Sequence, residues 1–132
     1  MKLSLLLRLN AILYVIFGIA FALYSPLMLA FFGILENEGS AELYWYAISF
    51  ARMFGAVLFG FGFVIWAISP SVSADLGRKI VAAFILAHLT ALVVALTQQA
   101  SIWGMLAGWI MVGVLLALFA GYMMIFSRKS WD

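Results

Sequence analysis

The clearest indication of the fold is the stretch SFARMFGAVLFGFGFVIWAIS, residues 49–69, which is almost entirely apolar and carries one charged side chain, Arg52. About 20 predominantly apolar residues are enough for a helix that crosses the hydrocarbon core of a bilayer. The whole chain has this character, with 68% hydrophobic and 9% charged residues over 132 positions. Soluble domains contain about 25% charged residues, so we expect lipid to surround most of the chain.

Four stretches of this kind are separated by short polar segments. We predict membrane spans at residues 9–34, 43–68, 80–96 and 102–126. The segments between them contain Gly, Pro, Ser, Thr, Gln and charged residues, and none is long enough for a separate soluble domain. The sequence therefore predicts an all-α membrane protein, with one domain over residues 1–132 folded as an antiparallel bundle of four transmembrane helices.

Basic residues flank the predicted spans on one side only. Lys2 and Arg8 precede the first span, and Arg78 and Lys79 precede the third. Arg128 and Lys129 follow the fourth. The segment between the first two spans carries only acids, and the segment between the last two carries no charge. Because Lys and Arg are enriched in cytoplasmic loops, we expect both termini to be cytoplasmic.

Composition also limits the chemistry. The chain has no cysteine, which excludes disulfides, thiolate metal sites and thiol catalysis. A formal net charge of +2 is too small to indicate a nucleic-acid partner. His88 is the single histidine, and no acid lies within a predicted span, so we expect no metal and no haem or other cofactor. No nucleophile–base–acid set accompanies His88, and we name no catalytic residue.

Small residues at helical spacing indicate how the spans pack, since they let helix backbones approach closely within lipid. They are Ala11, Gly18 and Ala22 in the first span, Gly55, Gly60 and Gly62 in the second, Ala83, Ala87, Ala91 and Ala95 in the third, and Gly104, Gly108, Gly113, Ala117 and Gly121 in the fourth. We expect these surfaces to join helices within the chain, and the same motifs could also join two copies.

Arg52 raises the sharpest question, because a charge at this depth costs at least about 2.5–3.5 kcal/mol. It lies about 13 Å inside the second span at about 1.5 Å per residue. With no acid within any predicted span, three interpretations stay open. The side chain extends outward to the interface, faces the bundle interior and bonds neutral acceptors, or meets an acid of a partner subunit.

His88 lies at a similar depth from the other membrane face. The candidate ligand-binding residues are Arg52, His88, Ser49, Tyr14, Asn10 and Thr90. A positive charge without its own carboxylate would favour an anionic or carbonyl-bearing ligand. His88 would either titrate near neutral pH as part of such a site or only hydrogen-bond to a neighbouring helix.

The four spans, the cytoplasmic termini and the sequence ARMFGAVLFGFGFVIWA, residues 51–67, together resemble small bacterial four-helix integral membrane proteins of unknown function, DoxX-like proteins among them. The resemblance covers the whole chain and is architectural, and no motif carries a catalytic residue across. It implies a multi-pass protein of the bacterial cytoplasmic (inner) membrane that is linked to redox partners.

Three functions are compatible with these features. The first is a non-enzymatic accessory subunit or binder of a small hydrophobic or anionic ligand within the bundle. The second is a homodimeric small transporter or permease whose glycine-rich helices slide. The third is a membrane enzyme acting on a lipid or quinone, which requires Arg52 and His88 to lie within reach of each other. The expected partners are the lipid bilayer, a second copy or a larger membrane complex.

Overall fold

The computed structural model describes residues 2–36, 39–103 and 105–127, with only the backbone at residues 102 and 103. The described elements are α1 Leu3–Leu23, α2 Ser25–Phe31, α3 Ala41–Ile68, α4 Ala74–Gln98, the π-helix η1 Gln99–Trp103, and α5 Leu106–Phe126. No β-strand occurs within the described ranges. The prediction of an all-α chain is confirmed.

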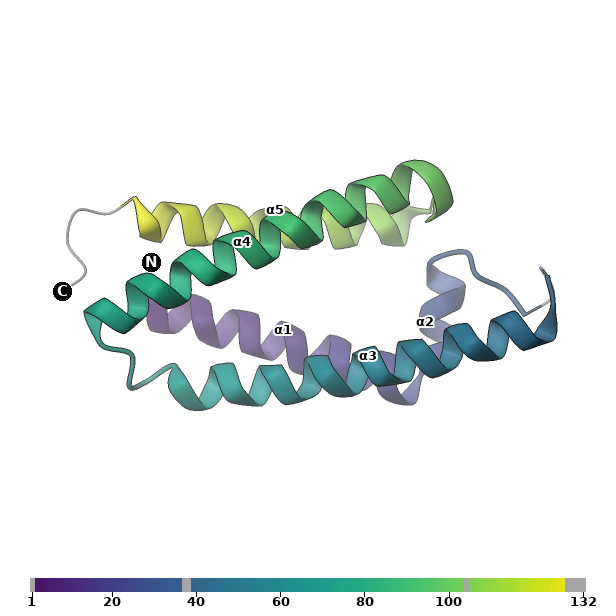
Figure 1. Cartoon of the computed structure of the whole chain (residues 1–132), viewed down its shortest axis with the longest axis horizontal. Coiled ribbons are helices and arrows are strands. Elements are labelled where there is room, and N and C mark those ends of the chain that lie inside the picture. Colours follow the sequence, from purple (N-terminus) through teal and green to yellow (C-terminus); the bar gives the residue numbers. More distant parts are fainter. Residues whose placement is uncertain (1, 37–38, 104, 128–132) are drawn as a thin grey trace.

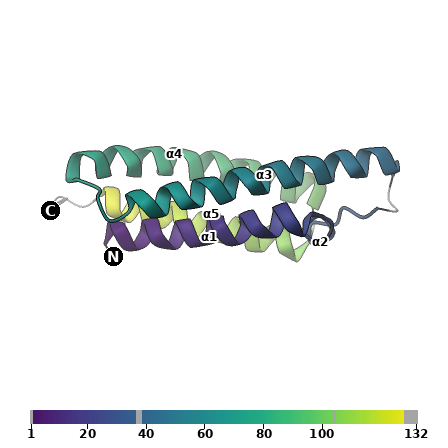
Figure 2. The same ribbon diagram turned by 90° about the horizontal axis from the view of Figure 1, so that it is seen from below.

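Among the described residues, four helices are long and apolar enough to cross a membrane: α1, α3, α5, and α4 with its continuation to Ser101. The shortest have 21 residues, which is about 32 Å at about 1.5 Å per residue and matches a hydrocarbon core of about 30 Å. The four helices extend roughly along one common direction (Figures 1 and 2). These helices confirm the prediction of four helices that are long and apolar enough to span a membrane, and they indicate an integral membrane protein.

The first predicted span, residues 9–34, is two helices and not one. α1 already starts at Leu3 and ends at Leu23, and α2 starts at Ser25. Pro26 lies in the first turn of α2. Proline has no N–H to donate, and its ring clashes with the carbonyl four residues earlier. α1 therefore cannot continue through this point, and α2 turns across the end of the bundle (Figure 1).

The other helix ends differ from the prediction at the polar connections. α3 begins at Ala41, after Ser40 Oγ accepts the backbone N–H of Leu43 at 3.3 Å as an N-cap. α4 begins at Ala74, directly after Ser73 and ahead of the predicted membrane span 80–96, and it carries Asp75 in its first turn, where the helix dipole favours negative charge. The predicted span 102–126 starts only at Leu106 in α5, because residues 99–103 continue α4 as a π-helix.

α1 and α3 approach each other closely at glycines. A Cβ added to Gly18 would lie 2.8 Å from Phe59 Cα, and one added to Gly55 would lie 2.7 Å from the Gly18 carbonyl oxygen. Gly62 is similarly confined by α1. The packing surface predicted for the first two spans is confirmed at these positions. Gly60 is the exception, because a Cβ there would have open space.

The alanine stripe predicted for the third span is wrong as a packing surface over most of its length. Ala83 and Ala87 are exposed and Ala91 is partly buried, whereas Ala95 is buried. The buried face of α4 is rotated from that stripe and consists of Gly77, Val81, His88, Leu92 and Ala95. In α5, Gly108 and Gly121 are buried, Gly113 and Ala117 are exposed, and Gly104 lies outside the described residues. Larger side chains, not the alanines, therefore hold α4 against its neighbours.

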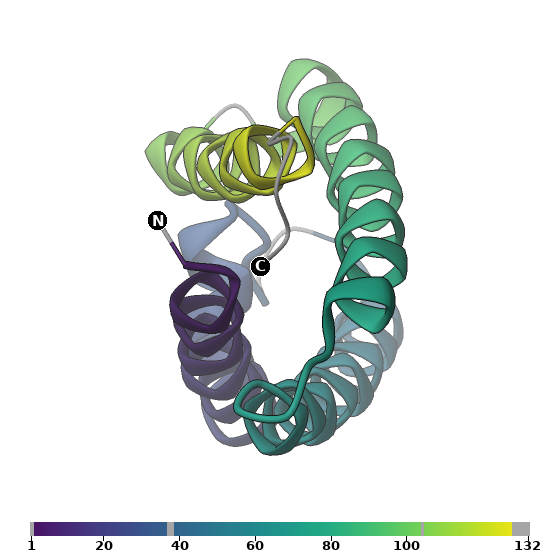
Figure 3. The ribbon, with the colours of Figure 1, turned by 90° about the vertical axis from the view of Figure 1, so that its left-hand side faces the viewer.

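Viewed end-on, α1, α3, α4 and α5 follow one another around a ring (Figure 3). Within this ring α1 packs along α3, and α4 packs along α5, so that the molecule consists of two helix pairs. The first turns of α1 and α4 and the last turns of α3 and α5 meet in one hydrophobic cluster, which includes Leu7, Ile65, Val81, Tyr122 and Ile125.

Basic side chains surround this end of the molecule. The Arg8 guanidinium lies 6.0 Å from the centre of the Trp66 ring, and that of Arg78 lies 5.8 Å from the centre of the Phe126 ring. Lys79 pairs with Asp75 at 2.8 Å on the exposed surface. We call this end, where α1 and α4 begin, the basic end. α2 and η1 lie at the opposite end (Figure 1).

Candidate ligand site between the helix pairs

Five side chains form a cluster between the two helix pairs, which we call the polar cluster: Asn10 and Tyr14 of α1, Phe84 and His88 of α4, and Tyr122 of α5. Asn10 Nδ2 donates a hydrogen bond of 2.9 Å to the Tyr122 hydroxyl oxygen, which links one pair to the other. The Phe84 ring stacks on the Tyr122 ring with 5.0 Å between their centres, and the His88 ring lies 5.3 Å from that of Tyr122.

His88 bonds to its own helix, contrary to the expectation of a bond to a neighbouring one. Its Nδ1 lies 2.7 Å from the Phe84 carbonyl oxygen. Since a carbonyl oxygen only accepts, Nδ1 carries the hydrogen, and Nε2 of the neutral ring is then an acceptor. His88 is 1% exposed, and Nε2 has no partner among the described residues.

Asn10 supplies a second acceptor without a partner. The residue is 0% exposed, and its Oδ1 has no hydrogen bond within the described part of the chain. Leaving a buried polar group unpaired costs about 1–3 kcal/mol. With Oδ1 of Asn10 and Nε2 of His88 both unpaired, the polar cluster favours a group that donates hydrogen bonds.

Tyr14 stands at the edge of the polar cluster. Its ring centre lies 6.5 Å from that of His88, and the residue is only partly buried. Tyr14 is one helical turn before Phe17 on α1, and residues three or four apart lie on the same helix face. The side chain of Tyr14 therefore lies between the polar cluster and the apolar residues that follow along α1.

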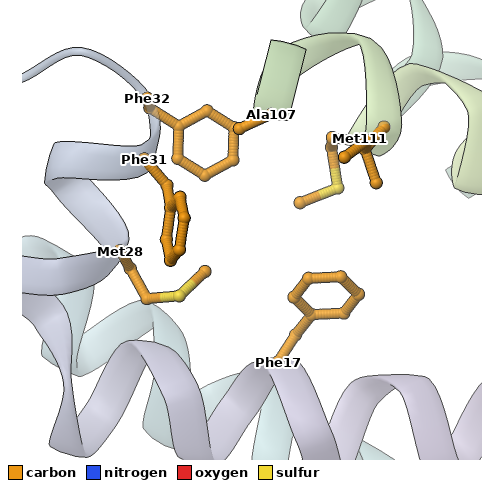
Figure 4. A pocket seen from close by; sticks show the side chains of 7 residues that line it. Phe17, Met28, Phe31, Phe32, Ala107 and Met111 are labelled. Carbon is orange, nitrogen blue, oxygen red and sulfur yellow. The ribbon is translucent and has the colours of Figure 1, made fainter. Parts of the chain in front are cut away.

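An apolar pocket lies beyond Tyr14, towards the opposite end. It has a volume of about 210 Å³ and is lined by Phe17, Met28, Phe31, Phe32, Ala107, Ile110 and Met111. Figure 4 shows these side chains, from α1, α2 and α5, around a shared space. None has a side-chain nitrogen or oxygen, so the pocket suits hydrocarbon. It is smaller than the roughly 300–1,000 Å³ of sites that enclose whole drug-sized ligands, which favours a slender chain.

Arg52 does not belong to this site. It is exposed on α3 and has no hydrogen-bond or ion-pair partner among the described residues. Glu42, the acid on the same helix, accepts a hydrogen bond of 2.7 Å from the Tyr46 hydroxyl. The structure therefore places Arg52 outside the bundle interior, where the remaining interpretations are extension to the interface and an acid of a partner subunit.

Ser49 and Thr90 also lie outside the site. Both are exposed, and each hydroxyl donates to a carbonyl of its own helix: Ser49 Oγ to Trp45 at 3.0 Å, and Thr90 Oγ1 to Leu86 at 2.9 Å. Of the six predicted site residues, the structure brings together Asn10, Tyr14 and His88.

Sequence reasoning missed Tyr122 and the pocket residues. Tyr122 lies in the last turns of α5, where a tyrosine is ordinarily read as an anchor at the membrane interface. Its hydroxyl is the feature of the sequence that could have identified it as a site residue, because a tyrosine hydroxyl within a span needs a hydrogen-bond partner. No comparable signal marks the pocket, since its lining residues are those of any apolar helix.

Within the described part of the chain, no three His, Asp or Glu side chains lie close enough together to hold a metal ion. No protein-family model matches the chain, and neither a curated protein nor a solved structure shows significant similarity to it. The geometry of the polar cluster and the apolar pocket is therefore the basis on which a function can be inferred.

Proposed function

We propose that this chain is a non-enzymatic integral membrane protein that holds a slender hydrophobic ligand between its two helix pairs. The observation that carries the proposal is the apolar pocket of about 210 Å³ at the meeting of α1, α2 and α5. α1 and α3 are closely packed at their glycines and α4 packs along α5, whereas α1 and α5 meet chiefly through side chains. Space between the pairs can therefore be filled by a ligand without separating either pair.

The proposal includes four antiparallel spans with both termini in the cytoplasm. Its support is the position of Lys2, Arg8, Arg78 and Lys79, all near the basic end. Arg128 and Lys129 follow α5 and lie outside the described residues. Because cytoplasmic flanks are enriched in Lys and Arg, the basic end faces the cytoplasm. The resemblance to DoxX-like proteins adds a bacterial cytoplasmic membrane to the proposal.

A hydrophobic ligand fits this interior better than an anionic one. Arg52 is exposed outside the bundle, so its charge does not compensate an anion at the pocket. The fully buried unpaired atoms of the polar cluster, Asn10 Oδ1 and His88 Nε2, are acceptors and offer an anion no hydrogen bond. The uncharged lining of the pocket offers an anion no compensation for lost hydration.

Neither alternative function has an observation in its favour. The enzyme acting on a lipid or quinone requires Arg52 and His88 to lie within reach of each other, but Arg52 is exposed and His88 is buried in the polar cluster. The homodimeric transporter requires a second copy. Exposed small residues such as Ala83 and Ala87 are compatible with contact to a second copy, but they are equally compatible with contact to lipid.

The test is photolabelling of the purified protein with a long-chain alkane that carries a diazirine. Ala107→Phe places a ring in the pocket and should lower labelling of the α1, α2 and α5 lining residues at least tenfold. Ala117→Phe is the matched control, because Ala117 is exposed on the same helix. Labelling spread over all exposed faces, and equal in the two variants, would contradict the proposal.

A further inference from the structure

We propose that the ligand is an uncharged amphiphile whose head group bears O–H or N–H donors. The head occupies the polar cluster, donating to His88 Nε2 and Asn10 Oδ1, and the chain occupies the apolar pocket. This inference rests on the proposed function and names the class of ligand. Its basis is that two buried acceptors without partners lie on the basic-end side of a pocket lined only by apolar side chains.

The polar cluster and the pocket follow one another along one face of α1. Asn10, Tyr14 and Phe17 are spaced by four and three residues, which places them on one face of the helix. Asn10 and Phe17 are about 10 Å apart along the axis at about 1.5 Å per residue. A head group at the polar cluster and the first part of a chain in the pocket span such a distance.

The facing helix repeats the same order. On α5 the pocket residues Ala107 and Met111 are followed, two to three turns later, by Leu118 and Tyr122, which belong to the hydrophobic cluster at the basic end. On both helices the polar groups of this face, the Asn10 amide and the Tyr122 hydroxyl, therefore lie on the basic-end side of the pocket. An amphiphile is the ligand class whose own polarity changes in this way.

The acceptors determine the chemistry of the head. The hydrogen on His88 Nδ1 is committed to the Phe84 carbonyl at 2.7 Å, so Nε2 is left to accept. The Asn10 amide nitrogen donates one hydrogen bond to the Tyr122 hydroxyl oxygen, and Oδ1 is left to accept. Two acceptors on the basic-end side of the pocket suit a head group with two donors, such as the two hydroxyls of a monosubstituted glycerol. A phosphate or carboxylate head supplies no donor when ionised.

Entry of the head requires Tyr14 to move. His88 Nε2 is enclosed in this structure, and Tyr14 is a partly buried member of the polar cluster on the side of the pocket. The Tyr14 hydroxyl has no hydrogen bond among the described residues, so a shift of this side chain breaks none. Rotation of the Tyr14 ring therefore opens a path between the two parts of the site.

The experiment compares two probes with the same chain, the dodecyl monoether of glycerol and its dimethyl ether, in competition with the diazirine label. Only the first carries hydroxyl donors. Wild-type protein should bind the monoether about tenfold more tightly, since the dimethyl ether leaves both acceptors unpaired. His88→Phe and Asn10→Leu should each reduce this preference several-fold with little change in binding of the dimethyl ether, which also shows that the variants are folded.

The outcomes separate the two proposals. Equal binding of the two probes by wild-type protein, with both blocked by Ala107→Phe, would overturn the polar head site and leave the hydrophobic ligand standing. Binding of neither probe would overturn both. A preference for the monoether that survives both His88→Phe and Asn10→Leu would also overturn the head site. The hydroxyls of the monoether would then donate to acceptors other than His88 and Asn10. Thr90→Val is the control, since its hydroxyl bonds only its own helix on the exposed face.

Discussion

The contact between α1 and α3 and the contact between α1 and α5 are built in opposite ways. Gly18, Gly55 and Gly62 bring α1 and α3 so close that a single added carbon atom would meet a neighbouring chain atom. α1 and α5 are held further apart and meet through long side chains, among them Asn10 and Tyr122. The first contact has no room for a ligand, whereas the second has an apolar pocket beside it.

This difference separates structural from functional surfaces in a protein made almost entirely of apolar residues. In lipid, burying apolar side chains does not by itself join helices, so close backbone approach holds a pair together. A surface that lacks close approach, yet contains buried polar atoms without partners, is poorly explained by stability alone. The space between the pairs is therefore where a function is expected.

The largest expected effect is on the glycine contact. Gly55→Ala should destabilise the protein by about 1–3 kcal/mol, because the added Cβ overpacks against the α1 backbone. Gly60→Ala on the same helix is the matched control and should have almost no effect, since its Cβ meets open space. Reversible unfolding in mixed detergent micelles measures both. Equal destabilisation by the two variants would mean that α1 and α3 do not pack as described.

A smaller effect is expected where the pairs meet through side chains. Tyr122→Phe removes the hydroxyl that accepts from Asn10 and should destabilise the protein by about 1 kcal/mol, as hydrogen bonds between membrane helices do. Thr90→Val, which removes an exposed hydroxyl bonded within its own helix, should change stability less. The same unfolding assay applies. No loss in Tyr122→Phe would argue that the two pairs are not linked at this point.

The smallest effect on the ligand site is expected from Arg52. Arg52→Leu should leave affinity for the alkane probe within about twofold, because the exposed side chain shares no partner with the pocket. Insertion into the membrane should become more favourable by up to about 2.5–3.5 kcal/mol. Probe titration and an insertion assay measure the two quantities. A loss of binding as large as that of Ala107→Phe would show that Arg52 acts at the site after all.

The sequence predicts the helices better than it predicts what they face. Four long apolar stretches suffice for the spans, because length and composition alone decide whether a helix can cross a bilayer. The glycines of the first two spans were also found, since close packing needs small residues. The break at Pro26 was missed, because apolar residues resume directly after it, at residues 27–32.

The orientation of single side chains was predicted less well. Asn10, Tyr14 and His88 meet as a group, but Arg52, which looked like the centre of the site, is exposed. The reason is that an apolar helix in lipid has no polar face to mark its outside, so periodicity does not show which side faces the bundle. Tyr122 was missed because its pairing with Asn10 depends on how α1 and α5 are aligned.

The central claim is that the space between the helix pairs holds a hydrophobic ligand. Native mass spectrometry of the protein extracted in mild detergent tests it most directly, with Ala107→Phe and Ala117→Phe prepared alongside. We predict one small bound species on the wild-type chain and on Ala117→Phe, and its loss from Ala107→Phe. A bare chain mass for the wild-type protein, or an adduct retained equally by all three proteins, would contradict the claim.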